Sequence, residues 1–308
     1  MDKIIVIVGP TAVGKTALSL KLAKKLNGEI ISGDSMQVFK GLDIGTAKVS
    51  KEEQNQVPHF LIDTKEIDEE ITVIQWVAAA RLKIDEIVKR GHIPIIVGGT
   101  GFYIGALLGD VVLAKNNAAK DPKIRAKWQE YANLNGEEAL HQQLAQIDLE
   151  AAKVIPKGNV RRVIRALEVF ELTKQPFSKQ TMPEAKRYYD AQIVGLRTER
   201  QRLYQRINAR VDEMIELGLE KEAFQLYQAT NLKLQSGQGI GYKEWLDYFE
   251  QRNDKLATIE LIKRNSRRFA KRQLTWFRHQ LKGIIWYDLV TNENSIDEII
   301  RDIENKKC

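Results

Sequence analysis

The chain has 308 residues, a formal net charge of +7, 43% hydrophobic residues and 29% charged residues. This composition excludes a fibrous or disordered protein and allows a large hydrophobic core. The only cysteine is Cys308, which excludes an intrachain disulfide framework, and the four histidines lie too far apart for metal-ligand spacing. The positive charge favours an anionic partner, which could be a nucleic acid, an anionic membrane or a phosphorylated substrate.

The first third of the chain alternates short β-branched runs with helical patterns. A buried strand is predicted at Lys3–Val8 and a helix at 16–26, followed by a strand at 29–32, a helix at Val73–Lys89 and a strand at 93–97. This alternation indicates a parallel sheet covered on both faces. The inward candidates on the helix at Val73–Lys89 are Ile74, Val77, Leu82, Ile84, Ile87 and Val88.

Two apolar segments could suggest export or a membrane. The run at residues 4–8 is too short for a signal peptide. Residues 95–114 carry glycines at four-residue spacing, but Pro94 and the pair Gly98-Gly99 fit a strand, a turn and a helix start better than a membrane span. We expect a reduced, cytoplasmic monomer that does not bind membranes.

From about residue 115 the pattern changes to helical stretches at 121–149 and 159–172 without a convincing strand. A strand at 192–196 and helices from 198 onward then resume the α/β pattern. A helical insertion at 113–189 is favoured over a continuous α/β domain with extra helices. The nucleotide-binding-type core then comprises residues 1–112 and 190–308.

A phosphate-binding motif follows the first strand. Its residues are Gly9, Pro10, Thr11, Ala12, Val13, Gly14, Lys15 and Thr16, which match G-x-x-x-x-G-K-[ST] between a strand and a helix. Backbone N–H groups and the helix N-terminus point at phosphate oxygens, Lys15 adds a positive charge and Thr16 can offer its hydroxyl to Mg²⁺. The motif indicates a polyphosphate site without specifying ATP. The predicted fold class is α/β, with a phosphate-loop NTPase-like parallel sheet core and an inserted helical domain.

Two aspartates lie where strands could end. Asp34 follows the strand at 29–32, so it is expected either in the ligand crevice near the phosphate loop or as a helix N-cap, and position alone leaves the two even. Asp63 ends the apolar run 59–63. Asp63 could organise a Mg²⁺ ion or be a surface turn residue, and the role as a turn residue is favoured.

Two basic segments suggest contact with nucleic acid. Arg161 and Arg165 share one face of a predicted helix, and Arg162 flanks that face. Residues 263–282 hold eight basic residues and no acidic one, with Trp276 and Phe277 interleaved. Phosphate contacts and a solvated helix face both stay open as interpretations.

Together these stretches resemble the bacterial tRNA dimethylallyltransferases, also called tRNA isopentenyltransferases. The resemblance runs from about residue 3 to about residue 286. It rests on GPTAVGKT at 9–16, GDSMQVFKGLDIGTAK at 33–48, PIIVGGTGFYI at 94–104, VRRVIRALEVF at 160–170, GIGYKE at 239–244 and RRFAKRQLTWFR at 267–278. A small departure is Phe39, where the family usually shows Tyr, and packing there is expected to tolerate it.

The resemblance implies transfer of a dimethylallyl group from dimethylallyl diphosphate to N6 of the adenosine 3′-adjacent to the anticodon in tRNA, with release of diphosphate and with Mg²⁺ as cofactor. It implies Asp34 as the general base and Thr100 as a second catalytic residue, which contacts the target nucleotide and the reaction centre. The implied diphosphate ligands are Gly9, Pro10, Thr11, Ala12, Val13, Gly14, Lys15, Thr16 and Arg210, and Thr16 is also the implied metal ligand. The implied contacts to the tRNA anticodon stem-loop are Asp34, Ser35, Met36, Gln37, Thr100, Arg125, Arg161, Arg162, Val163, Ile164 and Arg165, with Gly241, Tyr242 and Lys243 as further candidates.

Two other classes of protein share parts of this pattern. A small-molecule kinase would use the same loop for ATP, and it would turn over ATP without RNA. A non-catalytic RNA-binding protein would use the loop as a nucleotide switch, and it would bind tRNA without forming a covalent product.

Overall fold

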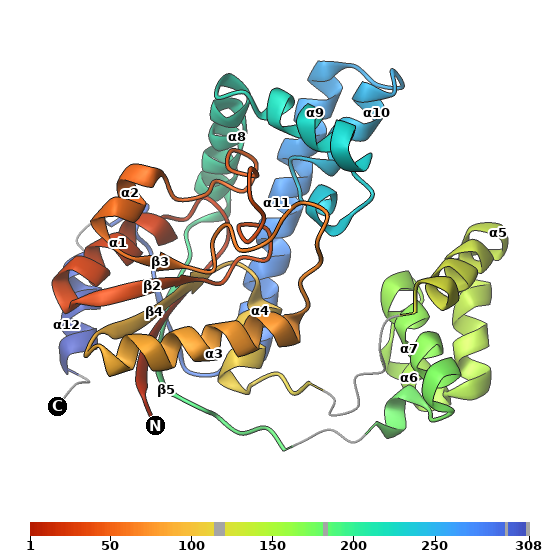
Figure 1. Cartoon of the computed structure of the whole chain (residues 1–308), viewed down its shortest axis with the longest axis horizontal. Helices are drawn as coiled ribbons and strands as arrows, with labels where there is room; N and C mark the ends of the chain where they lie inside the picture. Colours follow the sequence, from red (N-terminus) through yellow and green to blue (C-terminus); the bar gives the residue numbers. More distant parts are fainter. Residues whose placement is uncertain (114–120, 181–183, 293–294, 306–308) are drawn as a thin grey trace. The chain divides into compact units, whose positions relative to one another are not determined.

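The structure is a computed structural model that describes residues 1–113, 121–180, 184–292 and 295–305. The chain divides into two compact units, one formed by Met1–Val111 with Lys186–Cys308 and the other by Val112–Ala185 (Figure 1). The first unit holds a parallel sheet and the second is helical. The predicted fold class, an α/β core with an inserted helical domain, is confirmed.

The sheet of the first unit has the strand order β3-β2-β4-β1-β5-β6, and every neighbouring pair is parallel. The strands are β1 (Lys3–Val8), β2 (Gly28–Ser32), β3 (His59–Phe60), β4 (Ile93–Gly98), β5 (Asp190–Leu196) and β6 (Ile284–Tyr287). β1 lies between β4 and β5, with Ile5 opposite Ile95 on one side and opposite Gln192 on the other. The β-branched residues that fill β1 are therefore buried on both faces of the sheet.

Helices cover both faces of this sheet (Figure 1). The helices of this unit are α1 (Lys15–Leu26), α2 (Lys51–Gln56), α3 (Val73–Lys89), α4 (Gly101–Leu108), α8 (Arg200–Glu216), α9 (Leu219–Thr230), α10 (Leu246–Phe249), α11 (Lys255–Gln280) and α12 (Ser295–Asn305), of which α9 and α10 lie away from the sheet. Ile5 and Ile7 of β1 share one core cluster with Leu18 and Leu22 of α1 and with Ile299 of α12. On the other face, α3 lies along the sheet and the Trp76 indole donates to the Ser32 carbonyl at 3.3 Å.

The core face of α3 differs in part from the prediction. Val77, Ile84 and Ile87 are buried as expected, and Trp76 and Ala80 join them, but Ile74 is 42% exposed and Leu82 is 57% exposed. Ile74 and Leu82 are eight residues apart, so they share the outer side of the helix, away from the buried stripe. The assignment of these two residues to the core was wrong because apolar character alone does not fix which face packs on the sheet.

The apolar segment with glycines at four-residue spacing, which could suggest a membrane span, forms β4 and α4 of the core. In the described part of the chain, no helix is both long enough and apolar enough to cross a membrane. The expected cytoplasmic location stays a prediction.

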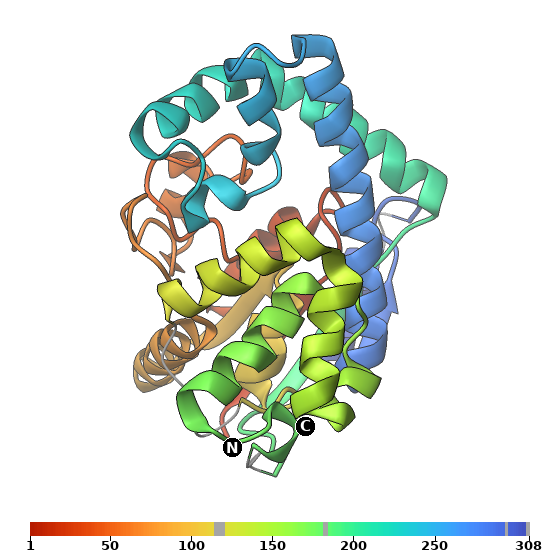
Figure 2. The same ribbon diagram turned by 90° about the vertical axis from the view of Figure 1, so that its right-hand side faces the viewer.

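The second unit is a helical bundle with its own hydrophobic core (Figure 2). Its helices are α5 (Pro122–Ile147), α6 (Leu149–Val154) and α7 (Val160–Thr173), followed by the 3₁₀ turn η1 (Phe177–Lys179). α5 contains a kink at Gly136, whose φ of 84° is left-handed and suits a residue without a Cβ. Leu140 and Leu144 of α5 pack in this core with Leu167 of α7.

Candidate active site

A cavity of about 370 Å³ lies in the first unit at the carboxyl ends of β1, β2 and β4. In an open parallel sheet this edge is where ligands bind. The cavity brings together five residues singled out from the sequence, namely Lys15, Thr16, Asp34, Thr100 and Arg210. Thr11, Ser35, Met36 and Gln37 line it as well, together with Gly241, Tyr242 and Lys243.

The phosphate loop connects β1 to α1 in a tight turn. Ala12 has a φ of 63° and Gly14 a φ of 100°, so both residues are left-handed, and α1 begins directly after Gly14. The Lys15 ammonium folds over the loop and donates to the carbonyls of Gly9 at 3.0 Å and Pro10 at 2.7 Å. Such a loop at a helix N-terminus is a ready anion site, since unpaired N–H groups and the helix dipole both favour negative charge.

Two cations of this cavity, Lys15 and Arg210, are largely shielded from water. Burial lowers the pKa of Lys15 to about 7, and the charge of Arg210 adds to this shift while Asp34 opposes it. Burial also lowers the pKa of Arg210, which donates to the Thr11 hydroxyl at 3.2 Å. Partly desolvated positive charges that face each other gain from an anion placed between them, so this end of the cavity suits a diphosphate.

Asp34 lies beside these cations and caps no helix. Its Oδ1 accepts from the backbone N–H of Met36 at 2.8 Å, whereas the next helix along the chain is α2, which is capped by Ser50. The N-cap interpretation of Asp34 is therefore wrong. Burial raises the pKa of Tyr103 to about 12, and the charge of Asp34 adds to this shift.

Thr100 is bound to the segment that carries Asp34. Its hydroxyl accepts from the Ser35 N–H at 3.0 Å, and its own N–H donates to the Gly33 carbonyl at 3.3 Å. Gly98 approaches Gly33 so closely that a Cβ on Gly98 would lie 2.2 Å from the Gly33 oxygen. The ends of β2 and β4 are thus joined at the cavity, and Asp34 and Thr100 occupy one wall of it.

The other residues of the 34–39 stretch serve the cavity wall. The Gln37 amide accepts from the Ser32 hydroxyl at 2.8 Å and donates to the Thr46 carbonyl at 3.3 Å. Met36 packs so closely on Gly239 that a Cβ there would lie 2.8 Å from the Met36 methyl. Phe39 is fully buried.

Asp63 lies outside the cavity. It adopts a left-handed turn with a φ of 53° and binds Lys48 at 2.6 Å and Lys51 at 3.6 Å. The favoured interpretation as a turn residue is confirmed.

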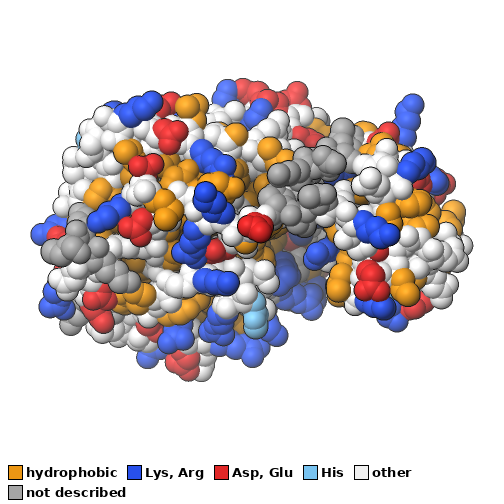
Figure 3. Space-filling model, turned by 90° about the horizontal axis from the view of Figure 1, so that it is seen from below, with side chains coloured by type: hydrophobic (Ala, Val, Ile, Leu, Met, Phe, Trp, Pro, Cys, Tyr) orange, Lys and Arg blue, Asp and Glu red, His pale blue; other side chains and the backbone are white. Residues whose placement is uncertain are grey.

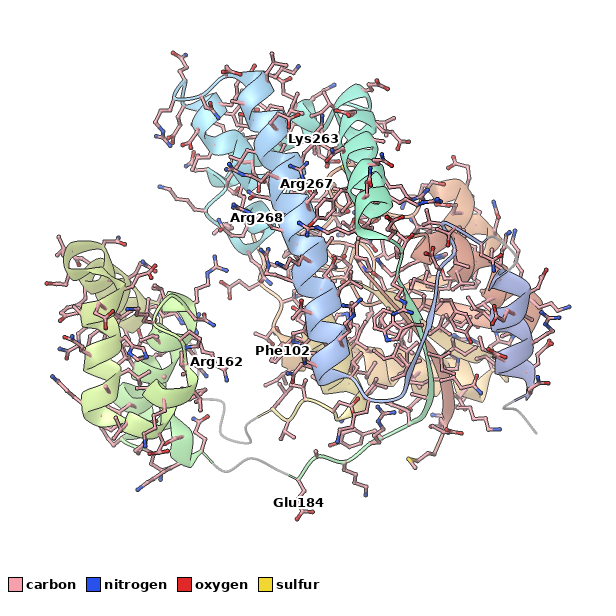
Figure 4. All side chains as sticks on the ribbon, turned by 180° about the vertical axis from the view of Figure 1, so that it is seen from behind. Phe102, Arg162, Glu184, Lys263, Arg267 and Arg268 are labelled. Carbon is pink, nitrogen blue, oxygen red and sulfur yellow. The ribbon has the colours of Figure 1, made fainter. Side chains whose placement is uncertain are left out.

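The arginines predicted to bind RNA in the helical unit have different surroundings. Arg161 and Arg162 are exposed on α7, and Figure 4 labels Arg162. Arg125 and Arg165 both bind the buried carboxylate of Glu168. Val163 is 0% exposed and Ile164 is 6% exposed, so their side chains belong to the core of this unit.

The basic stretch at 263–282 also divides into two sets. Lys263 binds Asp212 at 2.7 Å, and Arg267 donates to Asn208 at 2.6 Å, so both are engaged within the fold (Figure 4). Within this stretch, the exposed cations that form no ion pair with a described residue are Arg264, Arg268, Lys271, Arg272, Arg278 and Lys282. Lys and Arg side chains are also spread widely over the face shown in Figure 3.

Two residues of the site were not singled out from the sequence. Glu222 accepts from the backbone N–H groups of Asp43, Ile44 and Gly45 at 2.8–3.0 Å and from the Tyr242 hydroxyl at 2.6 Å. Gln273 of α11 lines the cavity beside the phosphate loop. The backbone groups that each of them binds lie more than a hundred residues away in sequence, so no local pattern indicates them.

The fold and the cavity define a phosphate-loop α/β protein in which the anion-binding loop faces a carboxylate. The comparisons agree with that class. A family model described as IPP transferase matches residues 37–280. The tRNA dimethylallyltransferase of Ligilactobacillus salivarius is 49% identical over 305 residues, which cover 99% of each chain. That of Geobacillus thermodenitrificans is 50% identical and covers 99% of this chain and 97% of its own. The chain belongs to the IPP transferase family.

Solved structures agree with this assignment. The tRNA isopentenylpyrophosphate transferase of Bacillus halodurans matches with a TM-score of 0.74 at 45% identity, covering 99% of this chain and 97% of its own. A eukaryotic dimethylallyltransferase acting on tRNA matches with a TM-score of 0.78 at 30% identity, covering 97% of this chain and 77% of its own.

Proposed function

We propose that this chain transfers a dimethylallyl group from dimethylallyl diphosphate to N6 of the adenosine 3′-adjacent to the anticodon in tRNA, releasing diphosphate. The main observation that supports this proposal is that Asp34 lines the same cavity as the phosphate loop and Arg210. A site with a carboxylate beside a diphosphate cradle suits a reaction that removes a proton from one substrate while a diphosphate leaves the other. The names of relatives about 50% identical over the full chain support the same activity.

Asp34 is the proposed general base. The adenine amino group is a poor nucleophile because its lone pair is delocalised into the ring. As its nitrogen bonds to the allylic carbon, the C–O bond to diphosphate breaks and the amino proton passes to Asp34. Asp34 Oδ1 is occupied by the Met36 N–H, whereas Oδ2 accepts no hydrogen bond from the described residues and is available for the proton. Thr100, joined to the same wall through Ser35, is placed to contact the target nucleotide.

The phosphate loop, Lys15 and Arg210 stabilise the leaving group. Negative charge grows on the diphosphate as the C–O bond breaks, and preorganised N–H groups and cations lower the energy of that state. The Lys15 ammonium gains a stronger partner there than the carbonyls it contacts in the free loop.

Mg²⁺ is the proposed cofactor. The residues present fit such an ion, because the Thr16 hydroxyl lines the cavity at the start of α1 and Mg²⁺ accepts hard oxygen ligands together with substrate phosphates. No cluster of three His, Cys, Asp or Glu side chains in the described part of the chain offers an all-protein metal site. When bound, the ion would neutralise diphosphate charge.

The tRNA is proposed to contact both units through the exposed cations. In the helical unit, which we take as the tRNA-contacting domain, Arg161 and Arg162 are free to bind phosphates. On α11 the candidates are Arg264, Arg268, Lys271, Arg272 and Arg278. Taking the target base out of its stack costs roughly a few kcal/mol, and such phosphate contacts offset that cost. Because one chain carries every group of the site, we propose a monomer.

The direct test is to incubate the wild-type protein with unmodified tRNA, dimethylallyl diphosphate and Mg²⁺ and to analyse the digested tRNA by mass spectrometry. The proposal predicts one five-carbon addition on a single adenosine next to the anticodon. Rapid ATP turnover without RNA would support a kinase instead, and tRNA binding without a covalent product would support an RNA-binding switch.

A further inference from the structure

Gln273 lies on the inner face of α11 between two loops of the cavity. It is only 6% exposed, and its neighbours on the same face of α11 are the buried residues Ala270 and Phe277. Its Oε1 accepts from the Thr11 backbone N–H at 3.1 Å, and its Nε2 donates to the Gly99 carbonyl at 3.0 Å. A single side chain thus spans from the phosphate loop to the β4–α4 turn.

The orientation of this amide is determined by its partners. A backbone N–H can only donate and a carbonyl can only accept, so the oxygen of Gln273 must face Thr11 and its nitrogen must face Gly99. A carboxylate would lack the donor, and an aliphatic side chain would lack both groups. Glutamine therefore supplies at this site an acceptor and a donor in one uncharged buried group.

The two loops joined by Gln273 carry different parts of the site. Thr11 belongs to the phosphate loop, where its hydroxyl also accepts from Arg210. Gly99 immediately precedes Thr100, which is joined to Ser35 and so to the segment of Asp34. The contact is tight, because a Cβ on Gly99 would lie 2.2 Å from Gln273 Nε2. Trp276, one turn further along α11, packs on Gly101 of α4, so α11 holds this turn at two points.

We propose that Gln273 is a positioning residue that sets the distance between the donor-binding phosphate loop and the acceptor-binding wall of Thr100 and Asp34. The proposal rests on the proposed prenyl transfer, in which a donor and an acceptor must meet between these two loops. Small errors in that distance are expected to slow transfer strongly, because the rate depends on the alignment of the two reacting atoms.

Two substitutions of Gln273 separate the two contacts. Gln273→Glu keeps an oxygen for the Thr11 N–H but places a second oxygen against the Gly99 carbonyl. Single-turnover transfer to tRNA should fall about 10- to 100-fold, the rate equivalent of one unsatisfied buried group. The negative charge that glutamate adds beside the phosphate loop should also weaken the binding of inorganic diphosphate. Gln273→Met removes both contacts, so it should weaken diphosphate binding as well as transfer. Gln280→Met, an exposed glutamine on the same helix, is the matched control and should behave as wild type.

Gly99→Ala tests the same contact from the other side. The backbone of Gly99 is not left-handed, so alanine is allowed there, and its methyl should displace the Gln273 amide without adding charge. Transfer should slow about 10- to 100-fold, while the affinity for inorganic diphosphate stays within about threefold of wild type. Because both substitutions break the contact between Gln273 and Gly99, the double variant Gly99→Ala with Gln273→Met should be at most about threefold slower than the slower single variant.

Thermal unfolding confirms that each variant is folded, and Gly99→Ala keeps the test decisive if Gln273→Met does not fold. Transfer by Gly99→Ala within threefold of wild type, equal losses of diphosphate affinity in Gly99→Ala and Gln273→Met, or full additivity in the double variant would each overturn the positioning role. If the wild type itself makes no prenylated tRNA, the proposed function fails along with it. If the wild type transfers and the variants match it, only the positioning role fails.

Discussion

Arg125 and Glu168 form a bidentate ion pair in the helical unit, with both nitrogen-to-oxygen distances at 2.8 Å. Arg165 donates to the same carboxylate at 2.6 Å, and the Glu168 side chain is fully buried. Burial alone would raise the pKa of Glu168, but the hydrogen bonds from Arg125 and Arg165 hold it below its usual value. Part of the arginine cluster that suggested RNA contact therefore stabilises the helical unit itself.

Glu168→Ala should destabilise the protein. Removing the carboxylate leaves Arg125 and Arg165 without their buried partner, which costs about 2–4 kcal/mol, a value reduced from that of a fully buried pair because both arginines are partly exposed. Since the folded pKa is lowered, this stability is present above the unfolded pKa and is lost as pH falls through the folded pKa. Urea unfolding near neutral pH measures it, with Glu150→Ala, an exposed pair partner of Lys153, as control. A loss equal to that of the control would contradict the structural role.

Changing Arg161 and Arg162 to alanine should weaken tRNA binding and lower its salt dependence. Each lost phosphate contact reduces the slope of log affinity against log salt by about one, so the pair should reduce it by about two. Filter binding over a series of salt concentrations gives this slope. Lys153→Ala, in the same unit, serves as control. An unchanged slope would mean that the two arginines are only a solvated helix face.

The sequence alone was sufficient to predict the structural features that depend on residues close together in the chain. The phosphate loop and the strand before Asp34 could be predicted because each is a continuous pattern with a local physical reason. Glu222 and Gln273 could not, since the backbone groups that they bind lie 177–179 and 174–262 residues away and only the folded chain brings them together. β6 was also missed, because its four residues at the edge of the sheet give too short a pattern. The position of Asp34 after a strand left two interpretations open, a residue of the ligand crevice and a helix N-cap. The structure excludes the N-cap, because the next helix is α2, which Ser50 caps.

Glu222→Ala should release the loop at residues 43–45 over the cavity. Three backbone N–H groups and the Tyr242 hydroxyl lose their common acceptor, which should cost about 1–3 kcal/mol. Hydrogen exchange of the amides of Asp43, Ile44 and Gly45 should accelerate at least tenfold. Glu220→Ala is the matched control on the same helix, since Glu220 binds the side chains of Tyr248 and Lys255 instead. Unchanged exchange at the three amides would rule out the clamp.

Donor affinity should fall as pH rises above about 7. Lys15 has a pKa of about 7 in the free protein, so its ammonium fraction falls at higher pH. A bound diphosphate raises that pKa, so each binding event takes up a proton and the Kd should increase by up to about tenfold per pH unit. Calorimetry with dimethylallyl diphosphate between about pH 7 and pH 9, in buffers of different ionisation enthalpy, measures both effects. Lys15→Met should bind weakly without this slope, whereas Lys21→Met, exposed on α1, should keep it. A wild-type Kd independent of pH would contradict the lowered pKa.

The role of Asp34 is tested most directly by the single-turnover rate of transfer to tRNA in Asp34→Asn. The amide keeps the size of the carboxylate and can still accept from the Met36 N–H, so the wall of the cavity should persist. It cannot take the proton of the adenine amino group. Donor and tRNA affinity should therefore stay within a few-fold of wild type, while the transfer rate falls by roughly 10²–10⁴, the usual contribution of a general base. A transfer rate within threefold of wild type would remove Asp34 from the mechanism.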